Sequence, residues 1–283
     1  MIFASDLDQT LIYSVRSKGE TAIEEMVPVE LHEGRHISYM TKPAMEKLEQ
    51  LSRIARFVPV TTRIPEQFNR IFGIRETFSP EYVIVSNGGT ILVNGQVDQE
   101  WHSFVRDAVK QHCAEHTEIA GLFAQIASSH WVKSNDLCDE LFYSIVVERD
   151  RLPLESLEEL KLQLAPLGWS YSLQGRNIYL VPEKVSKGAA IQYVKEKLAA
   201  AFVYAAGDSL LDESLLLAAD YAISPVHGEL GRFYNTHPHI QFTEARGALA
   251  SEELLDAILE HARKRYKQSG LIIFNHTEEG IQT

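Results

Sequence analysis

The segment Asp6-Leu-Asp-Gln-Thr10 directly follows the apolar run Ile2-Phe-Ala-Ser5, and this junction decides the fold. The run predicts a buried strand over residues 2–6, because short apolar runs are typical of parallel strands that are covered on both faces. Side chains alternate along a strand, so Asp6 and Asp8 can be aimed at the same pocket. Ligands of open α/β sheets bind beyond the carboxyl ends of the strands. The two carboxylates are therefore candidate site residues.

Strand-like and helix-like patterns alternate along much of the remaining chain, which predicts an α/β fold with a mostly parallel sheet. The expected strands include residues 57–61 and 202–206, and the expected helices include residues 104–116 and 251–266. Pro59 lies inside the first of these strands and removes a ladder donor, so we expect that strand to be short or unusual in register. A hairpin is expected beside the site at residues 27–40.

The pattern changes between residues 95 and 181, where short strands and helices of an α+β type replace the regular alternation. We interpret this stretch as an inserted domain. The chain then divides into a first core part at residues 1–94, the insert at residues 95–181 and a second core part at residues 182–283. The insert also contributes three polar candidates for contact with a substrate: Lys133, Asn135 and Arg176.

Composition and charge exclude several classes of protein. The chain has 283 residues and a net charge of -12, which disfavours a general nucleic-acid surface because such a surface needs clustered Lys and Arg. No apolar run approaches the ~20 residues that span a bilayer, and the first residues lack the pattern of a secretory signal. We therefore expect a cytoplasmic protein with no membrane partner. Cys113 and Cys138 are expected to be reduced thiols.

Other polar residues follow other predicted strands or begin a helix. Gly207-Asp208-Ser-Leu-Leu-Asp212 follows an apolar strand and adds carboxylates, Thr61 ends another strand, and Lys187 begins a helix. Carboxylate oxygens suit a hard cation such as Mg²⁺. Phosphoryl transfer needs carboxylates, a metal, a hydroxyl and an ammonium, because its transition state spreads negative charge over three oxygens.

These motifs resemble those of the haloacid dehalogenase superfamily, whose first motif has the form Asp-x-Asp-x-Thr. Four motifs match in order: Asp6-Leu-Asp-Gln-Thr10, Val60-Thr61, Lys187-Gly188 and Gly207-Asp208-Ser-Leu-Leu-Asp212. The insert lies between the second and third motifs, as in the branch with a C2-type cap that includes Cof-type sugar phosphatases and sucrose-phosphate phosphatases. Asn87-Gly88-Gly89 also resembles the Asn-Gly-Ala segment of that branch. The resemblance implies a Rossmann-like core with an inserted α+β cap.

The resemblance also implies a role for each matching residue. Asp6 would be the nucleophile that forms an aspartyl-phosphate, and it would also bind Mg²⁺. Asp8 would protonate the leaving alkoxide, then activate water, and would offer its backbone carbonyl to the metal. Thr61 and Lys187 would hold the phosphoryl oxygens.

Two more acids complete the implied metal site: Asp208 would bind Mg²⁺ directly, and Asp212 would support it through water or through Lys187. Gln9 departs from the pattern, because the branch usually has Gly there. The second motif also departs, since it reads Thr-Thr-Arg where Thr-Gly-Arg is common. We prefer Thr61 to Thr62 because Thr61 directly follows the apolar strand.

The expected enzyme is a Mg²⁺-dependent phosphatase of a small phosphorylated metabolite, with a sugar phosphate as one candidate. A phosphomutase of the same superfamily and a non-catalytic binding or regulatory protein on the same fold are the alternatives. The sequence assigns no role to His227-Gly-Glu-Leu230, and it leaves the oligomeric state open. The apolar tail at residues 271–274 is interpreted as an added strand or as a contact with another subunit.

Overall fold

The computed structural model of the protein describes residues 1–233 and 238–268, so the apolar tail at residues 271–274 lies outside the described residues. The core is a five-stranded parallel sheet in the order β14-β13-β12-β1-β4. Its strands are β1 (Ile2–Ser5), β4 (Arg56–Pro59), β12 (Val203–Ala206), β13 (Tyr221–Ser224) and β14 (Ile240–Phe242). The prediction of an α/β fold with a parallel core sheet is confirmed.

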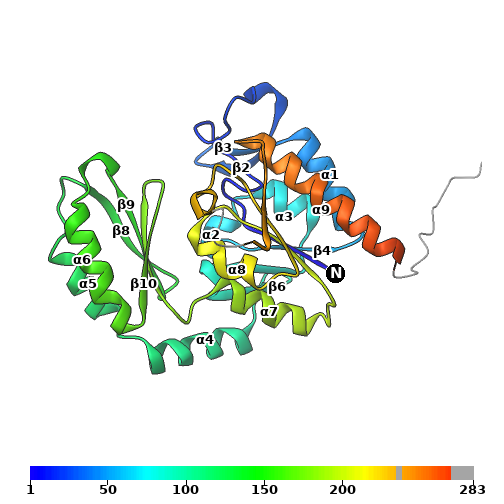
Figure 1. Ribbon diagram of the computed structural model, residues 1–283. Helices are drawn as coiled ribbons and strands as arrows, with labels where there is room; N and C mark the ends of the chain where they lie inside the picture. The colour runs from blue at the N-terminus through cyan, green and yellow to red at the C-terminus, as the bar shows by residue number, and fades with distance from the viewer. Residues whose placement is uncertain (234–237, 269–283) are drawn as a thin grey trace, which may run out of the picture.

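Helices cover both faces of this sheet (Figure 1). α1 (Lys42–Ser52) and α9 (Ala248–Gln268) pack on the face that receives Phe3. α7 (Lys187–Lys197) and α8 (Glu213–Leu217) pack on the face that receives Ile2 and Ala4. Every residue of β1 is buried, as expected of a central parallel strand with helices on both sides. This burial fixes the direction in which β1 delivers the residues that follow it.

Side-chain caps fix where two of the helices begin. The Thr41 hydroxyl accepts a hydrogen bond from the backbone N–H of Ala44 (3.2 Å), and the Ser186 hydroxyl accepts one from Ala189 (3.3 Å). Such caps satisfy backbone donors that have no partner inside the helix. The second cap makes Lys187 the first residue of α7.

Smaller antiparallel units extend the core on either side of the second motif. β2 (Met26–His32) pairs with β3 (Arg35–Thr41) in the predicted hairpin, and a three-stranded sheet contains β5 (Tyr82–Val85), β6 (Thr90–Val93) and β7 (Gln96–Val97). The strand predicted at residues 57–61 ends at Pro59, which has no N–H for the ladder. Beyond it, Val60 forms an isolated parallel bridge with Ile84. Two short helices connect these strands: α2 (Pro65–Phe68) and α3 (Phe72–Phe78).

A second unit, here called the cap, lies beside the core (Figure 1). Its antiparallel sheet has the order β10-β11-β9-β8. Its elements are α4 (Gln99–His112), α5 (His116–Ala124), β8 (Val132–Cys138), β9 (Phe142–Val147), α6 (Leu154–Leu164), β10 (Trp169–Gln174) and β11 (Asn177–Pro182). Helices α5 and α6 cover one face of the sheet, and the other face is turned toward the core. The exact division of the chain at residues 95 and 181 stays a prediction.

The helix predicted at residues 104–116 is wrong at both ends. α4 begins five residues earlier, because the Asp98 carboxylate caps it by accepting the N–H of Trp101 (3.1 Å). It ends at His112, since Cys113 has an extended backbone, and α5 then begins a new helix at His116. Hydrophobic spacing alone did not separate these two helices.

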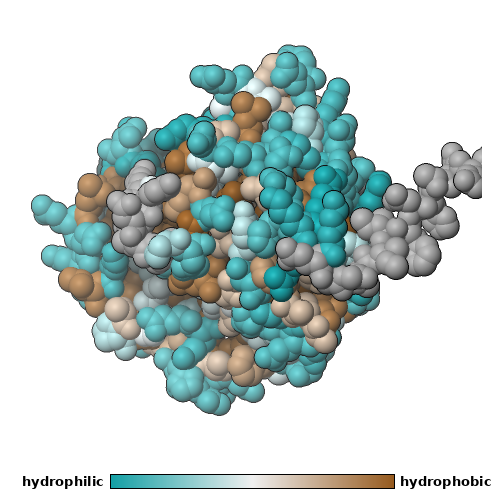
Figure 2. Space-filling view, turned by 45° about the vertical axis from the view of Figure 1, so that its right-hand side comes forward, coloured by the Kyte–Doolittle hydropathy of each residue, from teal (hydrophilic) through white to brown (hydrophobic). Residues whose placement is uncertain are grey.

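One face of the protein is mixed in polarity. Figure 2 shows hydrophilic side chains over much of the visible face, with hydrophobic side chains between them. Among the described residues, no helix combines the length and the hydropathy that crossing a membrane would require.

Gly88 lies where the chain leaves the core for the cap and where it returns, and it contacts both segments. Its carbonyl accepts a hydrogen bond from Trp101 Nε1, 2.9 Å away, near the start of α4. Its α-carbon packs directly on the backbone of Ser186, the residue before α7, and its φ is +96°. A side chain at Gly88 would therefore meet the backbone beside Lys187.

We predict that Gly88→Ala lowers the free energy of unfolding by about 3 kcal/mol, because the new methyl group clashes with the Ser186 carbonyl in addition to requiring a positive φ. Gly95→Ala is the matched control. Gly95 also has a positive φ (+79°), but nothing lies within 4 Å of an added Cβ, so only about 1 kcal/mol should be lost. Urea unfolding measures both; equal losses in the two variants would contradict the close approach.

Candidate active site

Three carboxylates and one ammonium meet beyond the carboxyl ends of β1 and β12. Lys187 Nζ lies 2.8 Å from Asp6 Oδ1 and 2.5 Å from Asp212 Oδ1. One carboxylate oxygen from each of Asp6, Asp208 and Asp212 lies within 4.8 Å of the others, and all three residues are buried. The structure thus brings together four of the residues that the sequence singled out, from segments about 200 residues apart.

The parallel register of the central strands explains this convergence. Ser5 of β1 lies beside Ala206 of β12, so both strands end at the same level. The N–H of Asp6 donates to the Ala206 carbonyl (2.9 Å), and Asp208 follows two residues later on the neighbouring loop. The Thr10 hydroxyl lies between the two acids, 3.4 Å from Asp6 Oδ2 and 3.5 Å from Asp208 Oδ1.

Protein donors occupy both carboxylate oxygens of Asp212. Oδ1 accepts from Lys187, and Oδ2 accepts from the N–H of Asp208 (3.2 Å), the N–H of Ser209 (3.0 Å) and the Ser209 hydroxyl (2.7 Å). Asp212 therefore fixes the lysine and the turn that carries Asp208. Asp6 and Asp208 remain the acids whose oxygens are better placed to bind a cation.

The three buried carboxyl groups share one neighbouring ammonium, that of Lys187. Burial raises the pKa of Asp6 to about 7; Asp212 adds to the rise and Lys187 opposes it. Burial, followed by the charge of Asp6, also raises the pKa of Asp208 well above its ordinary value. Burial alone would lower the pKa of Lys187. The negative charges of Asp212 and Asp6 have the larger combined effect and raise this pKa. These oxygen donors fit a hard divalent cation such as Mg²⁺, which would favour the ionised carboxylates.

Asp8 lies outside this acid cluster and pairs with Arg63. Its two oxygens accept hydrogen bonds from Arg63 Nε and Nη2, each at 2.7 Å. The Asp8 side chain is 47% exposed, whereas the cluster is buried. Asp8 is therefore the carboxylate of the first motif that faces outward.

Glu30 is the buried second partner of Arg63, and the sequence reasoning missed it. Arg63 Nη1 lies 2.6 Å from Glu30 Oε1 and Nη2 lies 3.0 Å from Oε2, while the Ser38 hydroxyl also donates to this carboxylate. Glu30 is only 1% exposed, and a charge so buried needs partners. The available signal was an acid between Val29 and Leu31 in the hairpin that we expected beside the site.

Thr61 is buried at the end of the second motif. Its hydroxyl accepts the N–H of Arg63 (3.1 Å), and its carbonyl accepts the N–H of Asn87 (3.0 Å). The neighbouring Thr62 is only half-buried, and its side chain works to lower the pKa of Tyr179 of β11 in the cap. The choice of Thr61 over Thr62 as the phosphate-binding hydroxyl stays a prediction.

Tyr179 is a cap residue that the sequence did not single out. Asn177 Nδ2 donates to its hydroxyl (3.3 Å). Burial, and then the nearby charge of Asp8, raise the pKa of Tyr179. This cap side chain therefore lies within electrostatic range of the outward-facing carboxylate of the core.

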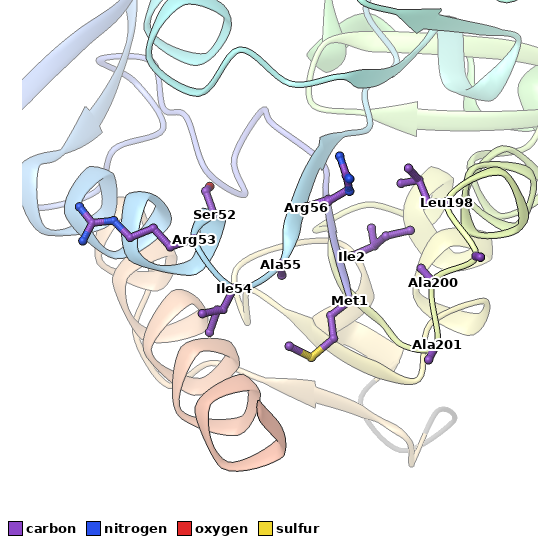
Figure 3. Close-up of a pocket in the computed structure, with 11 residues that line it drawn as sticks. Met1, Ile2, Ser52, Arg53, Ile54, Ala55, Arg56, Leu198, Ala200 and Ala201 are labelled. Atoms are coloured by element: carbon purple, nitrogen blue, oxygen red, sulfur yellow. The ribbon is translucent and has the colours of Figure 1, made fainter. Parts of the chain in front are cut away.

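Two pockets lie away from the acid cluster. One, of about 440 Å³, lies at the opposite edge of the sheet, where Met1 and Ile2 begin β1 beside Arg56 (Figure 3). The other, of about 680 Å³, lies between α4 and α7 and is lined by Trp101 and Tyr193. Neither is lined by a residue of the acid cluster, and ligands of open α/β sheets bind at the carboxyl edge.

The parallel core, the inserted cap and the four matching motifs define a phosphatase of the haloacid dehalogenase superfamily. The family model for sucrose-6F-phosphate phosphohydrolase matches residues 1–262, and the chain belongs to this family. No curated protein sequence matches the chain.

Solved structures share this fold over nearly the whole chain. The sucrose-phosphatase of Synechocystis sp. PCC6803, solved with sucrose and phosphate, has a TM-score of 0.64 at 16% identity and covers 93% of this chain and 98% of its own. SMU.1108c of Streptococcus mutans UA159 has a TM-score of 0.57 at 13% identity, with 92% and 98% covered. The subclass IIB sugar phosphatase BT4131 has a TM-score of 0.53 at 13% identity, with 96% and 99% covered. At these identities the likeness shows the fold.

We predict an unusual pH dependence of stability when no divalent cation is present. Because the pKa of Asp6 rises from 3.8 to about 7 on folding, the folded protein holds more protons than the unfolded chain between these values. The contribution of Asp6 to stability is therefore greatest at low pH and is lost as the pH rises toward 7. Relative to Asp6→Asn, the wild type should lose stability between pH 5 and pH 7 in EDTA.

Mg²⁺ should reverse this loss, because it binds the ionised carboxylates, so its stabilising effect should grow over the same pH range. Urea unfolding of both proteins, with EDTA or with Mg²⁺, measures the difference. A wild-type minus Asp6→Asn difference that stays constant between pH 5 and pH 7 in EDTA would contradict the prediction.

Proposed function

We propose that the protein is a Mg²⁺-dependent phosphatase that hydrolyses a sugar phosphate through an aspartyl-phosphate on Asp6. The observation that supports this most directly is the buried group of Asp6, Asp208, Asp212 and Lys187 at the carboxyl edge of the sheet. A buried carboxylate held by an ammonium, next to a second buried acid, is suited to receive a phosphoryl group and its charge.

In the first step, a carboxylate oxygen of Asp6 bonds to phosphorus while the bond from phosphorus to the sugar oxygen breaks. Lys187, 2.8 Å from Asp6 Oδ1, orients the nucleophile and offsets charge on the phosphoryl oxygens. Asp8 gives its proton to the leaving alkoxide. In the second step, Asp8 takes a proton from water, which attacks phosphorus and releases phosphate and Asp6. Mg²⁺, when bound by Asp6 and Asp208 with the Asp8 carbonyl, would keep the carboxylates ionised and neutralise phosphoryl charge.

Arg63 and Glu30 give Asp8 a resting position. A carboxyl that donates a proton must turn an oxygen toward the leaving group, and both oxygens of Asp8 accept bonds from Arg63. Glu30 stays bound to the same guanidinium, so Arg63 remains neutralised when Asp8 gives up one of these bonds. We therefore propose that one of the two hydrogen bonds between Arg63 and Asp8 breaks and re-forms during turnover. Glu30 holds the Arg63 guanidinium in place meanwhile.

The core-facing side of the cap sheet is the proposed leaving-group side. Ile178 and Leu180 of β11 pack under the cap helices, so Asn177 and Tyr179 alternate to the other side, toward the core. Asn135 pairs with Ile145 of the helix-covered face, which places it on the wrong side of the sheet for this role. Tyr179, rather than Asn135, is therefore our candidate for contact with the sugar.

The family supports the proposed substrate class. The matching family model is that of sucrose-6F-phosphate phosphohydrolase, and the sucrose-phosphatase with a TM-score of 0.64 was solved with sucrose and phosphate. Asn177 and Tyr179 supply neutral donors and acceptors, which suit sugar hydroxyls. We propose sucrose 6F-phosphate as the first substrate to test, within a panel of sugar phosphates.

Asp6→Asn should lower phosphate release by about 1,000-fold or more, because the amide is a poor nucleophile and has lost the charge that Lys187 holds. Asp107→Asn, on the exposed side of α4, is the matched control and should keep wild-type activity. Phosphate release is measured with Mg²⁺ on an aryl phosphate and on the sugar-phosphate panel. Intact-mass analysis of wild type mixed rapidly with substrate should detect the phosphorylated enzyme.

Three outcomes would contradict the proposal. Equal phosphate release by wild type and Asp6→Asn would remove Asp6 from the mechanism. Movement of phosphate between positions of one sugar, without release, would favour a phosphomutase. Binding without turnover over the whole panel would favour a binding or regulatory protein.

Tyr179→Phe should raise KM for the sugar phosphate by about 3- to 10-fold and change kcat less, because one hydrogen bond to the leaving group is lost. For an aryl phosphate without sugar hydroxyls, KM should not change. Tyr171→Phe, on the adjacent strand β10, is the control, since Tyr171 packs with the cap's own core. A similar rise in KM for both phosphates would rule out contact with the sugar.

A further inference from the structure

The segment His227-Gly-Glu-Leu230 touches both loops that carry the buried acids. His227 Nε2 lies 3.1 Å from the backbone carbonyl oxygen of Gln9, in the loop after β1. The N–H of Leu230 donates to the carbonyl of Asp208 (3.4 Å), in the loop after β12. Gly228 packs so closely on Asp208 that a Cβ would meet its carbonyl oxygen. One short segment after β13 therefore spans the two loops.

Gln9 needs such a contact because its backbone is in an unfavourable region. Its φ is +61°, which a residue with a side chain rarely adopts. Its N–H is satisfied by the Ile12 carbonyl (2.8 Å), and its own carbonyl points to His227. An uncommon backbone conformation persists when surrounding bonds over-determine it. The imidazole therefore supplies a restraint that Gly, the usual residue of the resembling branch, would not require.

The hydrogen bonds of His227 define which nitrogen carries the proton. Gly247, the residue before α9, donates its N–H to Nδ1 (3.3 Å), so Nδ1 must present a lone pair. Nε2 then carries the proton and donates to the Gln9 carbonyl. Only the neutral ring with its proton on Nε2 satisfies both partners. Burial lowers the pKa of His227, which favours the neutral ring.

We propose that His227 is a positioning residue that holds the Gln9 carbonyl and so fixes Asp6 and Asp8 relative to Asp208. The proposal rests on the proposed function, because that relative placement is what shared binding of Mg²⁺ requires. Gly228 and Leu230 fix the Asp208 loop. We call the contact of His227 with Gln9, together with the contacts of Gly228 and Leu230 with Asp208, the brace. His227 itself touches neither the phosphoryl group nor the metal; it acts through the backbone of the first motif.

The test compares His227→Ala, His227→Gln, Gln9→Gly and the double variant His227→Ala with Gln9→Gly. His227→Ala should lower kcat by about 10- to 100-fold and weaken Mg²⁺ binding, because the Gln9 carbonyl loses its side-chain partner and the positive-φ loop loses its restraint. His227→Gln should stay within about 3-fold of wild type, since its amide offers both a donor and an acceptor. Gln9→Gly should restore most of the loss in the double variant, because Gly adopts a positive φ without a brace.

Two readouts are independent of turnover. Calorimetric titration with Mg²⁺ should show the same order of affinities as the activities, with His227→Ala weakest. Nitrogen NMR of the wild-type ring should show protonated Nε2 and unprotonated Nδ1 at neutral pH. His130→Ala, an exposed histidine of the cap, is the control and should leave kcat and Mg²⁺ affinity unchanged.

The outcomes separate this proposal from the proposed function. If no substrate is turned over, the phosphatase assignment fails, and the NMR and Mg²⁺ titrations still decide whether the brace exists. Wild-type Mg²⁺ affinity in His227→Ala, or no rescue by Gln9→Gly, would overturn the brace. If His227→Ala does not fold, His227→Gln and the wild-type NMR spectrum decide it: a ring with its proton on Nδ1 is incompatible with the proposal.

Discussion

The ammonium of Lys187, held between Asp6 and Asp212, is the interaction on which the site depends. Removing one partner from a buried ion pair leaves an uncompensated charge and costs about 3–5 kcal/mol. The lysine joins the end of β1, the start of α7 and the turn after β12, which are distant in sequence. The same contact leaves a charge deficit, because one ammonium cannot neutralise three buried carboxylates. The charge deficit and the precise placement of the acids thus have one physical origin.

Local signals in the sequence predicted the parts of the fold that carry this contact. An apolar run followed at once by Asp6 placed that residue at the carboxyl edge, and the structure ends β1 at Ser5. The sequence also placed Lys187 at the start of a helix, and α7 begins at that residue. The cap helices were predicted less well, because Asp98 and Cys113 fix the ends of α4 and neither interrupts its apolar spacing. Periodicity indicates that a helix is present but not where it stops.

Contacts that depend on three-dimensional proximity could not be predicted. Glu30 and Arg63 are 33 residues apart, and only the folded hairpin brings them together around Asp8. The local signal for Glu30, its position between two apolar residues of the predicted hairpin, does not indicate which residue it pairs with. His227 is similar: its ring meets the first motif from more than 200 residues away, and its position after β13 gave no hint of the partner. The residues of the buried acid cluster lie in sequence motifs, whereas the residues that support them are recognised from the fold.

The bond from Trp101 Nε1 to the Gly88 carbonyl also has a mechanical consequence. Gly88 lies against Ser186, so the outgoing and returning chain segments of the cap meet at one point, next to the lysine. A rotation of the cap about this point would move its far end most and displace the charged centre least. Longer loops at the far rim of the cap would leave this contact intact. The architecture thus allows the far rim to diverge without disturbing the charged centre.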